Sequence, residues 1–423
     1  MRLVLQIATM LAFGLALGQF MRRLRQPAVV GEMIGGIILG PTIFGFLAPD
    51  LYVWLFQSSA NAAVVRDASI KLGMLFFLFL AGLEIDFSQI REIGRKALLI
   101  GSVGTLVPLA VGVGLVYAIP RGFWGPVAQE HFFAFSLFIG MNLANSANPV
   151  LARILMDLGL LKGPIGNMSM AATIVDDLIN WTLFAIVLSD IAPSGSVTSN
   201  SLPVSIGLVL LMFVVILGGG RWLAPRVLRW FKRHVKGPNG FIGVTALLVL
   251  IAASVSEALG VHAFLGAFLV GAALSGTVDE HREAHDVTTR FALSFFAPIY
   301  FISMGMTTNY ISNFDGLLVL LIVVVGIASK LGGVLLGAKL GGMALDRDTW
   351  AIGWGLNARG ATGIILAGVG LAAGVIDERI FVAIVVMALV TSLLAGPMMN
   401  WLLSSRIQRA REAEILALES GAA

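Results

Sequence analysis

Long stretches without a charged side chain constrain this sequence more than any other feature. Residues 204–220 contain no charge, and neither do residues 316–329. Hydrophobic side chains make up 58% of the 423 residues and charged side chains 12%, about half the charged share of an ordinary soluble domain. A soluble globule could not bury so much apolar surface, and a disordered chain would be far more polar. The sequence therefore predicts an integral membrane protein.

Helices, rather than barrel strands, are expected to cross the membrane. Lipid offers no hydrogen bonds, so a spanning segment must be a helix or part of a closed barrel. Continuous apolar runs, without the period-two alternation of barrel strands, favour helices. We therefore expect an all-α fold with about 13 transmembrane helices. They are predicted near residues 3–20, 28–47, 69–83, 97–119, 131–156, 165–189, 203–220, 239–257, 260–276, 291–306, 316–344, 349–375 and 379–403.

The distribution of lysine and arginine predicts how these helices are oriented, because cytoplasmic loops are enriched in both residues. With the N-terminus outside, 20 of the 28 basic side chains fall in inner loops and the C-terminal tail, and 5 fall outside. The start, Met1-Arg2-Leu3, has no clear cleavage pattern, so the first apolar run is expected to be kept as a helix. The chain is predicted to have its N-terminus outside and its C-terminus in the cytoplasm.

The remaining composition excludes several kinds of site. The net charge of +4 and the pI of about 9.6 are attributed to membrane topology, so no nucleic-acid partner is expected. Cysteine is absent, which excludes disulfides and thiol chemistry. His281 and His285 have the spacing of a metal-binding pair, but the charged run around them favours a solvated inner loop, with pH sensing as a lesser alternative. No cofactor is expected.

Thirteen helices can divide into six, one linker and six, and the two sets then have opposite topology. Inverted repeats of this kind build many secondary transporters. The fifth span contains the polar, helix-breaking residues Asn145, Ser146, Asn148 and Pro149, and the twelfth contains residues 355–360. Interrupted helices at matching positions point to an ion site near the membrane midplane. The alternative is a proline kink and an unrelated glycine-rich stretch.

Charged residues within the spans are the best functional candidates, because a charge in lipid costs several kcal/mol. Asp176 and Asp177 lie at the centre of the sixth span, and adjacent helix residues point about 100° apart. One carboxylate can thus face a neighbouring helix and the other an ion cavity. Hard oxygen ligands of this kind suit alkali cations as well as protons. Both aspartates are therefore candidate cation and proton ligands.

Two basic residues accompany these acids. A lysine as deep as Lys330 needs a carboxylate partner or must lose its proton, and Asp176 or Asp177 is the expected partner. Arg359 stands at the second break, with Asn357 close by. It is expected either to bind the carbonyl ends of half-helices or to pair with an acid for structure alone, and a structural role is favoured.

Three further charged residues have simpler interpretations. Lys339 is expected to reach the membrane surface from a helix end. Glu257 is expected to mark an outer helix boundary. Glu32 lies near the inner end of its span, where solvation and function are equally supported.

The double aspartate, the membrane lysine and the two helix breaks together make the chain resemble a known family. This family is the bacterial branch of the monovalent cation:proton antiporters, and specifically its sodium/proton exchangers with a double aspartate. The resemblance covers nearly the whole chain. Ser146 stands where the family usually has threonine, and Asp176-Asp177 is similar to its double-aspartate motif. The other matching segments are Gln26-Pro27-Ala28-Val29-Val30-Gly31-Glu32, Leu39-Gly40-Pro41, Phe77-Leu78-Phe79-Leu80-Ala81-Gly82-Leu83-Glu84, Ala152-Arg153, Gly266-Ala267-Phe268-Leu269, Pro298-Ile299-Tyr300-Phe301, Lys330 and Arg359-Gly360.

The resemblance implies a homodimer whose protomers each have two parts, with two crossed broken helices in a mobile core. The core would move against the dimerisation part in an elevator-like manner. The implied divisions are dimerisation helices in 1–96 and 239–306, core helices in 97–190 and 307–405, a linker helix with a basic loop in 191–238, and a cytoplasmic tail in 406–423.

The implied activity is exchange of Na⁺ or Li⁺ for H⁺ across a bacterial inner membrane by alternating access, with net charge movement. Asp177, Asp176 and Ser146 would bind the cation and Lys330 would be the charge partner. Asn145, Asn148, Pro149, Asn357 and Arg359 would support the breaks. The alternative is exchange of K⁺ or another monovalent cation for H⁺, with or without net charge movement.

Two observations bear on that choice. Potassium-efflux members commonly carry Gln-Asp, and no nucleotide-binding domain is expected in the short tail, which favours the sodium exchangers. However, Ala361 stands where the family often has a glutamate after Arg-Gly. The missing acid removes one partner for Lys330 or Arg359.

Two other functional classes, an intramembrane aspartyl protease and a channel, fit these residues less well. An intramembrane aspartyl protease needs facing carboxylates, whereas Asp176 and Asp177 diverge on one helix, so no enzyme is predicted. A channel needs a continuous pore lined by carbonyls or rings of charge. The inverted pattern and the titratable residues favour a transporter instead, with membrane lipid around it.

Overall fold

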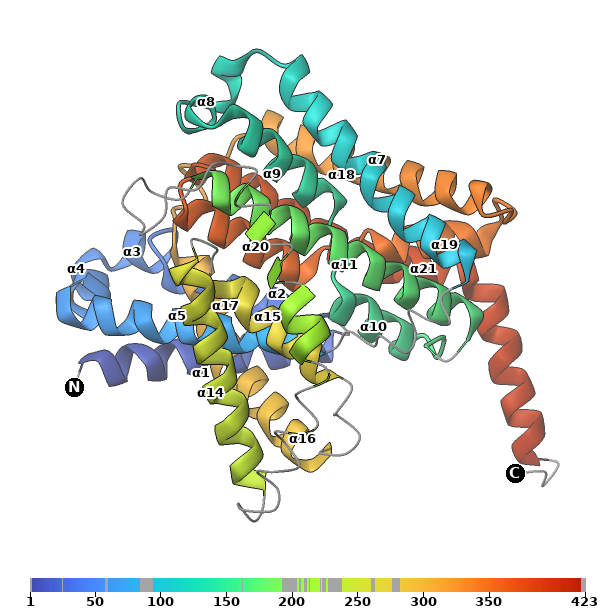
Figure 1. Cartoon of the computed structure of the whole chain (residues 1–423), viewed down its shortest axis with the longest axis horizontal. Coiled ribbons are helices and arrows are strands. Elements are labelled where there is room, and N and C mark those ends of the chain that lie inside the picture. Colours follow the sequence, from blue (N-terminus) through green and yellow to red (C-terminus); the bar gives the residue numbers. More distant parts are fainter. Residues whose placement is uncertain are drawn as a thin grey trace.

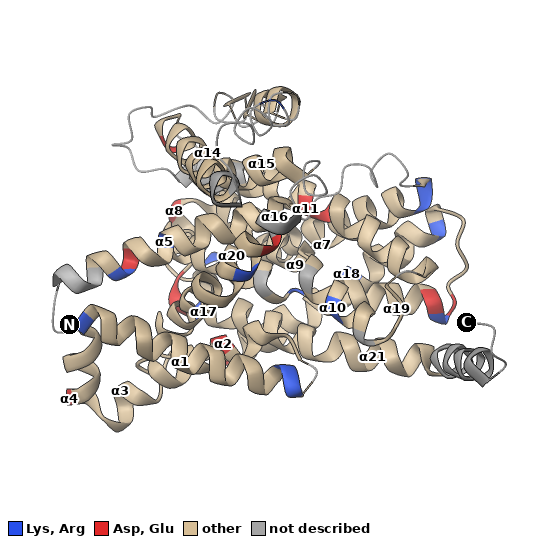
Figure 2. Cartoon of the chain, turned by 90° about the horizontal axis from the view of Figure 1, so that it is seen from below, with Lys and Arg blue, Asp and Glu red and all other residues tan. Residues whose placement is uncertain are grey.

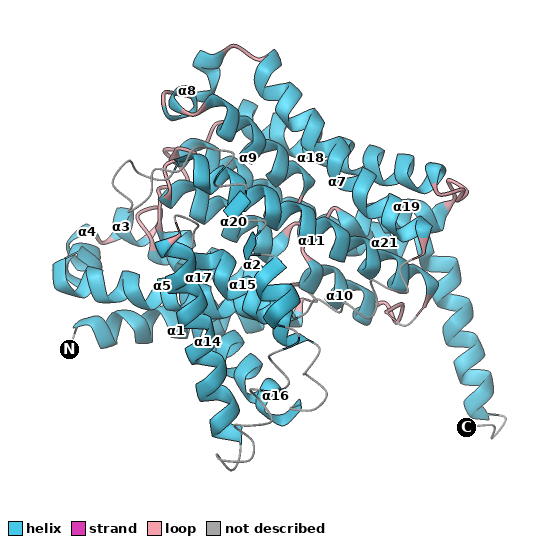
Figure 3. Ribbon diagram, viewed as in Figure 1, coloured by secondary structure: helices cyan, strands magenta, loops and turns pink. Residues whose placement is uncertain are grey.

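A computed structural model shows helices and connecting loops, and no strand, throughout the part of the chain that it describes (Figures 1 and 3). Most of the described ribbon carries neither acidic nor basic residues (Figure 2). The structure describes all residues except 1, 25, 58–59, 84–93, 162, 192–203, 205–206, 209–210, 213, 221, 223–225, 227–237, 260–262, 276–281 and 420–423.

Short loops connect most of the helices that are joined by described residues. In the first half they are α1 (Arg2–Arg23), α2 (Ala28–Leu39), α3 (Phe44–Leu47), α4 (Pro49–Tyr52), η1 (Val53–Gln57), α5 (Ala60–Leu83), α7 (Arg95–Ala118), η2 (Arg121–Trp124), α8 (Val127–Glu130), α9 (Phe132–Ala144), α10 (Asn148–Asp157) and α11 (Pro164–Ile191). In the second half they are η3 (Val214–Gly220), α14 (Pro238–Ala258), α15 (Ala263–Leu274), α16 (Arg282–Phe291), η6 (Ala292–Phe296), α17 (Ala297–Met306), α18 (Gly316–Leu340), α19 (Arg347–Leu356), α20 (Gly360–Ala372) and α21 (Glu378–Glu419).

These helices confirm the all-α membrane fold. Six are long and apolar enough to cross a bilayer, and the described residues include shorter apolar helices as well. Each predicted range contains described helical residues, but 203–220 and 260–276 are described only in part. The number thirteen therefore stays a prediction.

Two predicted boundaries are wrong. The third span starts at Ala60 rather than near residue 69, because the charged residues around Arg66 lie within the first turns of α5 instead of a loop. Arg66 is tied there by a hydrogen bond from Nη1 to the carbonyl oxygen of Phe56, 3.1 Å away. The predicted inner loop around His281 and His285 is the second difference: residues from Arg282 onward form α16, while His281 lies outside the described residues.

Helix pairs are packed closely where small residues line the contact. α2 packs against α1 and α17, and α5 against α15, while α7 packs against α18, α9 and α11. A Cβ atom at Gly101 of α7 would lie 2.7 Å from the carbonyl oxygen of Ala172 in α11. A Cβ at Gly333 of α18 would lie 3.0 Å from the carbonyl oxygen of Val103. The first approach requires glycine and the second leaves little room for any side chain, so these glycines bring α7, α11 and α18 together.

The two predicted helix breaks meet in space. α9 ends at Ala144 and α10 begins at Asn148, while α19 ends at Leu356 and α20 begins at Gly360. The backbone N–H of Ala147 donates to the carbonyl oxygen of Ala358, 2.6 Å away. Gly360 has a φ of +40°, a conformation that favours glycine, and its N–H donates to Ser392 Oγ at 2.9 Å. The interruptions are thus parts of one junction rather than separate kinks.

Candidate cation-binding site

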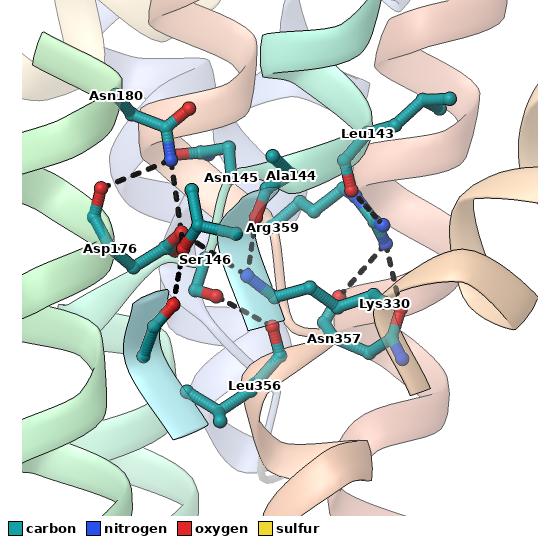
Figure 4. Close-up of polar contacts among 12 residues, drawn as sticks. Leu143, Ala144, Asn145, Ser146, Asp176, Asn180, Lys330, Leu356, Asn357 and Arg359 are labelled. Carbon is teal, nitrogen blue, oxygen red and sulfur yellow. Dashed lines mark hydrogen bonds and ion pairs between the residues drawn. The ribbon is translucent and has the colours of Figure 1, made fainter. Parts of the chain in front are cut away.

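Asp176 is the centre of a buried polar cluster beside this junction (Figure 4). Its side chain is 1% exposed in the middle of α11. Three donors converge on its Oδ1 atom: Lys330 Nζ at 3.2 Å, Asn180 Nδ2 at 3.0 Å and the hydroxyl of Thr105. No described protein group donates a hydrogen bond to the other carboxylate oxygen, Oδ2, which is also buried.

Lys330 reaches this carboxylate from α18, and its side chain is 1% exposed as well. The ammonium also donates to the carbonyl oxygen of Ala144, the last residue of α9. Of the two partners expected from the sequence, the structure thus places Asp176 against Lys330. A buried ammonium with only one partner would be costly, and the carbonyl supplies a second one.

Arg359 takes the carbonyl-binding role of the two that the sequence left open. Its guanidinium donates to the carbonyl oxygens of Asn142 at 3.2 Å, Leu143 at 2.7 Å and Gly326 at 2.8 Å, and to Asn357 Oδ1 at 2.9 Å. Among the described residues, Arg359 forms no ion pair with an acid. Unpaired carbonyls give the C-terminal end of a helix a partial negative charge. Arg359 and Lys330 therefore cover the C-terminal end of α9 with positive charge.

The polar residues of the first break mostly hold the two breaks together. Ser146 Oγ donates to the carbonyl oxygen of Leu356 at 2.7 Å, and Asn145 Nδ2 donates to Thr362 Oγ1 at 3.0 Å. Asn148 Oδ1 accepts from Thr173 Oγ1 at 3.0 Å, which ties α10 to α11.

The remaining predicted support residues lie on the half-helices themselves. Asn357 Nδ2 donates to the carbonyl oxygen of Ile327 at 3.4 Å. Pro149 lies in the first turn of α10, where the missing N–H of proline has no cost.

Asp177 and Glu32 are both buried, but in different places. Asp177, 8% exposed, follows Asp176 in α11. Glu32, 5% exposed, lies in α2 beside Gly18 of α1. The interpretation of Glu32 as a solvated helix-end residue is therefore wrong, because neighbouring helices cover it.

Two residues of the cluster were missed by the sequence analysis. Thr105 and Asn180 both donate to Asp176, from α7 and from the next turn of α11. Threonine and asparagine are uncharged and occur in many helices, so no sequence signal separates these two from their equivalents elsewhere. A spacing of four residues from Asp176 was the one available hint for Asn180.

The polar groups at the junction are mostly oxygen atoms. Among the described residues there is no group of three or more histidine, cysteine, aspartate and glutamate side chains that could hold a metal ion. The junction instead offers carboxylates, a serine hydroxyl and backbone carbonyls, the oxygen ligands that hard cations prefer.

Comparison with known proteins decides the family. The family model for the transmembrane sodium/hydrogen exchanger matches residues 7–405. The chain belongs to the sodium/hydrogen exchanger family. It is 31% identical over 386 residues to the Na⁺/H⁺ antiporter NhaS4 of Synechocystis sp., covering 90% of this chain and 92% of that relative.

Longer relatives share this exchanger region. The chain is 33% identical to cation/H⁺ antiporter 18 of Arabidopsis thaliana over 93% of its own length and 48% of the plant protein. It is 31% identical to K⁺/H⁺ antiporter 1 of Saccharomyces cerevisiae over 89% of its length and 43% of the yeast protein. The chain thus spans about half the length of these relatives.

A solved structure shares the exchanger fold. The sodium proton antiporter MjNhaP1 from Methanocaldococcus jannaschii superposes with a TM-score of 0.65 at 14% identity, covering 96% of this chain and 98% of that one. The all-α antiporter fold expected from the sequence is therefore confirmed, while the division into dimerisation and core parts stays a prediction.

Proposed function

We propose that this exchanger is a secondary active antiporter that moves Na⁺ or Li⁺ against H⁺ by alternating access. The observation that carries the proposal is the buried Asp176–Lys330 pair beside two helix breaks that meet. Charged residues so deep in a membrane protein mark ion pathways far more often than structural sites. The name of the Synechocystis relative supports Na⁺ as the cation.

Asp177 is proposed as the main ligand of the dehydrated cation, with Asp176, Ser146 and carbonyls at the breaks as further ligands. Asp177 would hold either a proton or the cation, so the two substrates compete for one site. Asp176 would leave or regain its ion pair with Lys330 as the site fills or empties. The family consists of transporters, and we assign no enzymatic reaction to this member.

The surrounding architecture is proposed on the same basis. Residues 1–96 and 239–306 would form the dimerisation part, and residues 97–190 and 307–405 the mobile core, joined by residues 191–238. Two protomers would form a homodimer within a bacterial inner membrane, with the N-terminus outside and the tail, residues 406–423, in the cytoplasm. The excess of lysine and arginine in one set of loops supports this orientation.

Potassium is the alternative cation, and two observations support it. The yeast relative is named for K⁺, and a Bacillus cereus relative, 27% identical over 94% of this chain, is named a Na⁺/H⁺-K⁺ antiporter. Ala361 also stands where the cation:proton antiporters often have a glutamate. Fewer acids near the site would change its preference among cations.

Proton movement driven by a panel of cations tests the proposal. The purified protein in proteoliposomes is challenged with gradients of Na⁺, Li⁺, K⁺ and Rb⁺ over a range of pH. Exchange with Na⁺ or Li⁺ supports the proposal, and exchange with K⁺ and Rb⁺ alone supports the alternative. A cation current that needs no counterflow of protons indicates a channel and contradicts both.

A further inference from the structure

Asp176 accepts hydrogen bonds from two uncharged side chains in addition to its ion pair with Lys330. Lys330, Asn180 and Thr105 all donate to the same oxygen, Oδ1, and they come from α18, α11 and α7. Asn180 is on the same helix as Asp176, so it moves with the carboxylate. Thr105 is the donor that ties the carboxylate to a second helix without carrying a charge.

The position of Thr105 follows from close packing one turn away. Gly101 precedes Thr105 by four residues, and Ala172 precedes Asp176 by four residues, so the two pairs face each other one turn apart. A Cβ at Gly101 would lie 2.7 Å from the carbonyl oxygen of Ala172 and 2.7 Å from Cβ of Val175. The absence of a side chain at Gly101 therefore lets the short Thr105 hydroxyl reach Asp176.

The single hydroxyl proton of Thr105 has two acceptors within reach, Asp176 and a carbonyl of its own helix. Thr105 is 0% exposed, and its Oγ1 also lies 2.7 Å from the carbonyl oxygen of Gly101 within its own helix. Hydrogen bonds to an ionised group are stronger than neutral ones, so the carboxylate gives the threonine a role that a bond to its own helix does not. A valine of nearly the same shape would fill the space and remove the donor.

We propose that Thr105 is a positioning residue that holds Asp176 by Oδ1 and keeps Oδ2 available to the transported cation. The inference rests on the proposed function, in which the Asp176–Lys330 contact breaks during each cycle. When Lys330 withdraws, Thr105 and Asn180 still hold Oδ1, so the carboxylate does not turn away (Figure 4 shows Asn180 and Lys330 approaching it from different helices). The site is thereby preorganised for the cation independently of the lysine.

Initial rates of cation-driven proton movement test this role. Thr105→Val is expected to raise the apparent KM for the cation about tenfold, the usual scale for losing a hydrogen bond to a charged group, with a smaller change in maximal rate. Thr105→Ser keeps the hydroxyl and is expected to restore the KM to within about twofold of the wild type. Should the valine variant not fold, Thr105→Ala replaces it, with the same expectation.

Thr182→Val is the matched control. Thr182 also donates to a carbonyl oxygen four residues back, that of Leu178 at 2.7 Å, and within the described part of the chain it forms no hydrogen bond with Asp176. Its replacement is expected to leave the KM unchanged. An unchanged KM in Thr105→Val overturns the inference. An equal rise of KM in the valine and serine variants also overturns it, because that result would indicate an effect of packing alone.

Cation-induced thermal stabilisation separates this inference from the function on which it rests. The Na⁺ concentration that gives half of the maximal rise in melting temperature is expected to increase in Thr105→Val and not in Thr105→Ser. A wild type that transports while Thr105→Val matches it in both assays overturns the inference alone. A wild type that shows neither transport nor stabilisation overturns the proposed function, and the inference with it.

Discussion

Lys330 Nζ lies 3.2 Å from Asp176 Oδ1, although 154 positions separate the two residues, and each side chain is 1% exposed. Removing a single ion from water costs several kcal/mol, so each residue stabilises the buried charge of the other. The lysine also donates to the carbonyl oxygen of Ala144. The pair thus joins α9, α11 and α18 at the point where the helix breaks meet.

Breaking this pair from one side is expected to destabilise the protein by about 3–5 kcal/mol, because the remaining charge stays buried. Asp176→Asn and Lys330→Gln are the single variants, and the double variant is expected to lose less than the sum of the two. Thermal unfolding in detergent measures each loss. Strictly additive losses around the cycle would show that the two residues do not interact.

The ion pair between Arg379 and Asp315 is the matched contrast. Arg379 Nη1 lies 3.0 Å from Asp315 Oδ2, but these side chains are 30% and 27% exposed. Partial hydration and counter-ions weaken such a pair, so its coupling energy is expected to be about 1 kcal/mol or less. Asp315→Asn retains an oxygen for the N–H of Leu318, which Asp315 caps at 3.0 Å, so the cycle with Arg379→Gln isolates the ion pair. A coupling as large as that of the buried pair would contradict the role assigned to burial.

The parts of the site that carry charge were predictable from the sequence. Asp176 and Lys330 are conspicuous because a charge within an apolar run has no inexpensive place in lipid. The two breaks were also predictable, since asparagine, proline and glycine interrupt helices wherever they gather. The sequence placed both breaks in matching spans, and the bond from Ala147 to Ala358 brings them together.

The uncharged contacts were not predictable. Thr105 is four residues from Gly101, and only the close approach of α7 to α11 makes its hydroxyl a partner of Asp176. The role of Arg359 stayed open because its partners are backbone carbonyls, which every residue has. The start of α5 was misplaced for a different reason. Charged residues such as Arg66 are typical of loops outside the membrane, but they also occur in the end of a helix that extends beyond the apolar part of its span.

Asp177→Asn is expected to abolish cation-driven proton movement while leaving a folded protein. The amide keeps the size of the side chain but binds neither a proton nor a cation with the affinity of a carboxylate. Proton release from purified protein in proteoliposomes, together with elution volume and melting temperature, gives the comparison. Glu257→Gln, at an exposed carboxylate near the end of α14, is the control and should retain exchange. Substantial Na⁺- or K⁺-driven exchange by Asp177→Asn would show that Asp177 is not a ligand of the transported cation.

Arg359→Gln is expected to destabilise the protein far more than Lys339→Gln. Loss of the guanidinium leaves the carbonyls of Asn142 and Leu143, in the last turn of α9, buried without their donor, at about 1–3 kcal/mol for each unsatisfied group. Lys339 is exposed in the last turn of α18, where its replacement should cost about 0.5 kcal/mol at most. Melting temperatures of the two variants give the test. Equal losses would mean that the carbonyl contacts contribute no net stability.

Exchange is expected to move net charge. If Asp177 gives up one proton to the cation, and cation binding makes the Asp176–Lys330 pair release a second, two protons cross for each Na⁺. One net charge then moves per cycle, which the membrane potential drives by about 2.3 kcal/mol per 100 mV. Reversal potentials measured in liposomes with imposed ion gradients report the ratio directly. A null point that does not shift with membrane potential would establish one-for-one exchange, and Lys330 would then serve only to stabilise Asp176 and the end of α9.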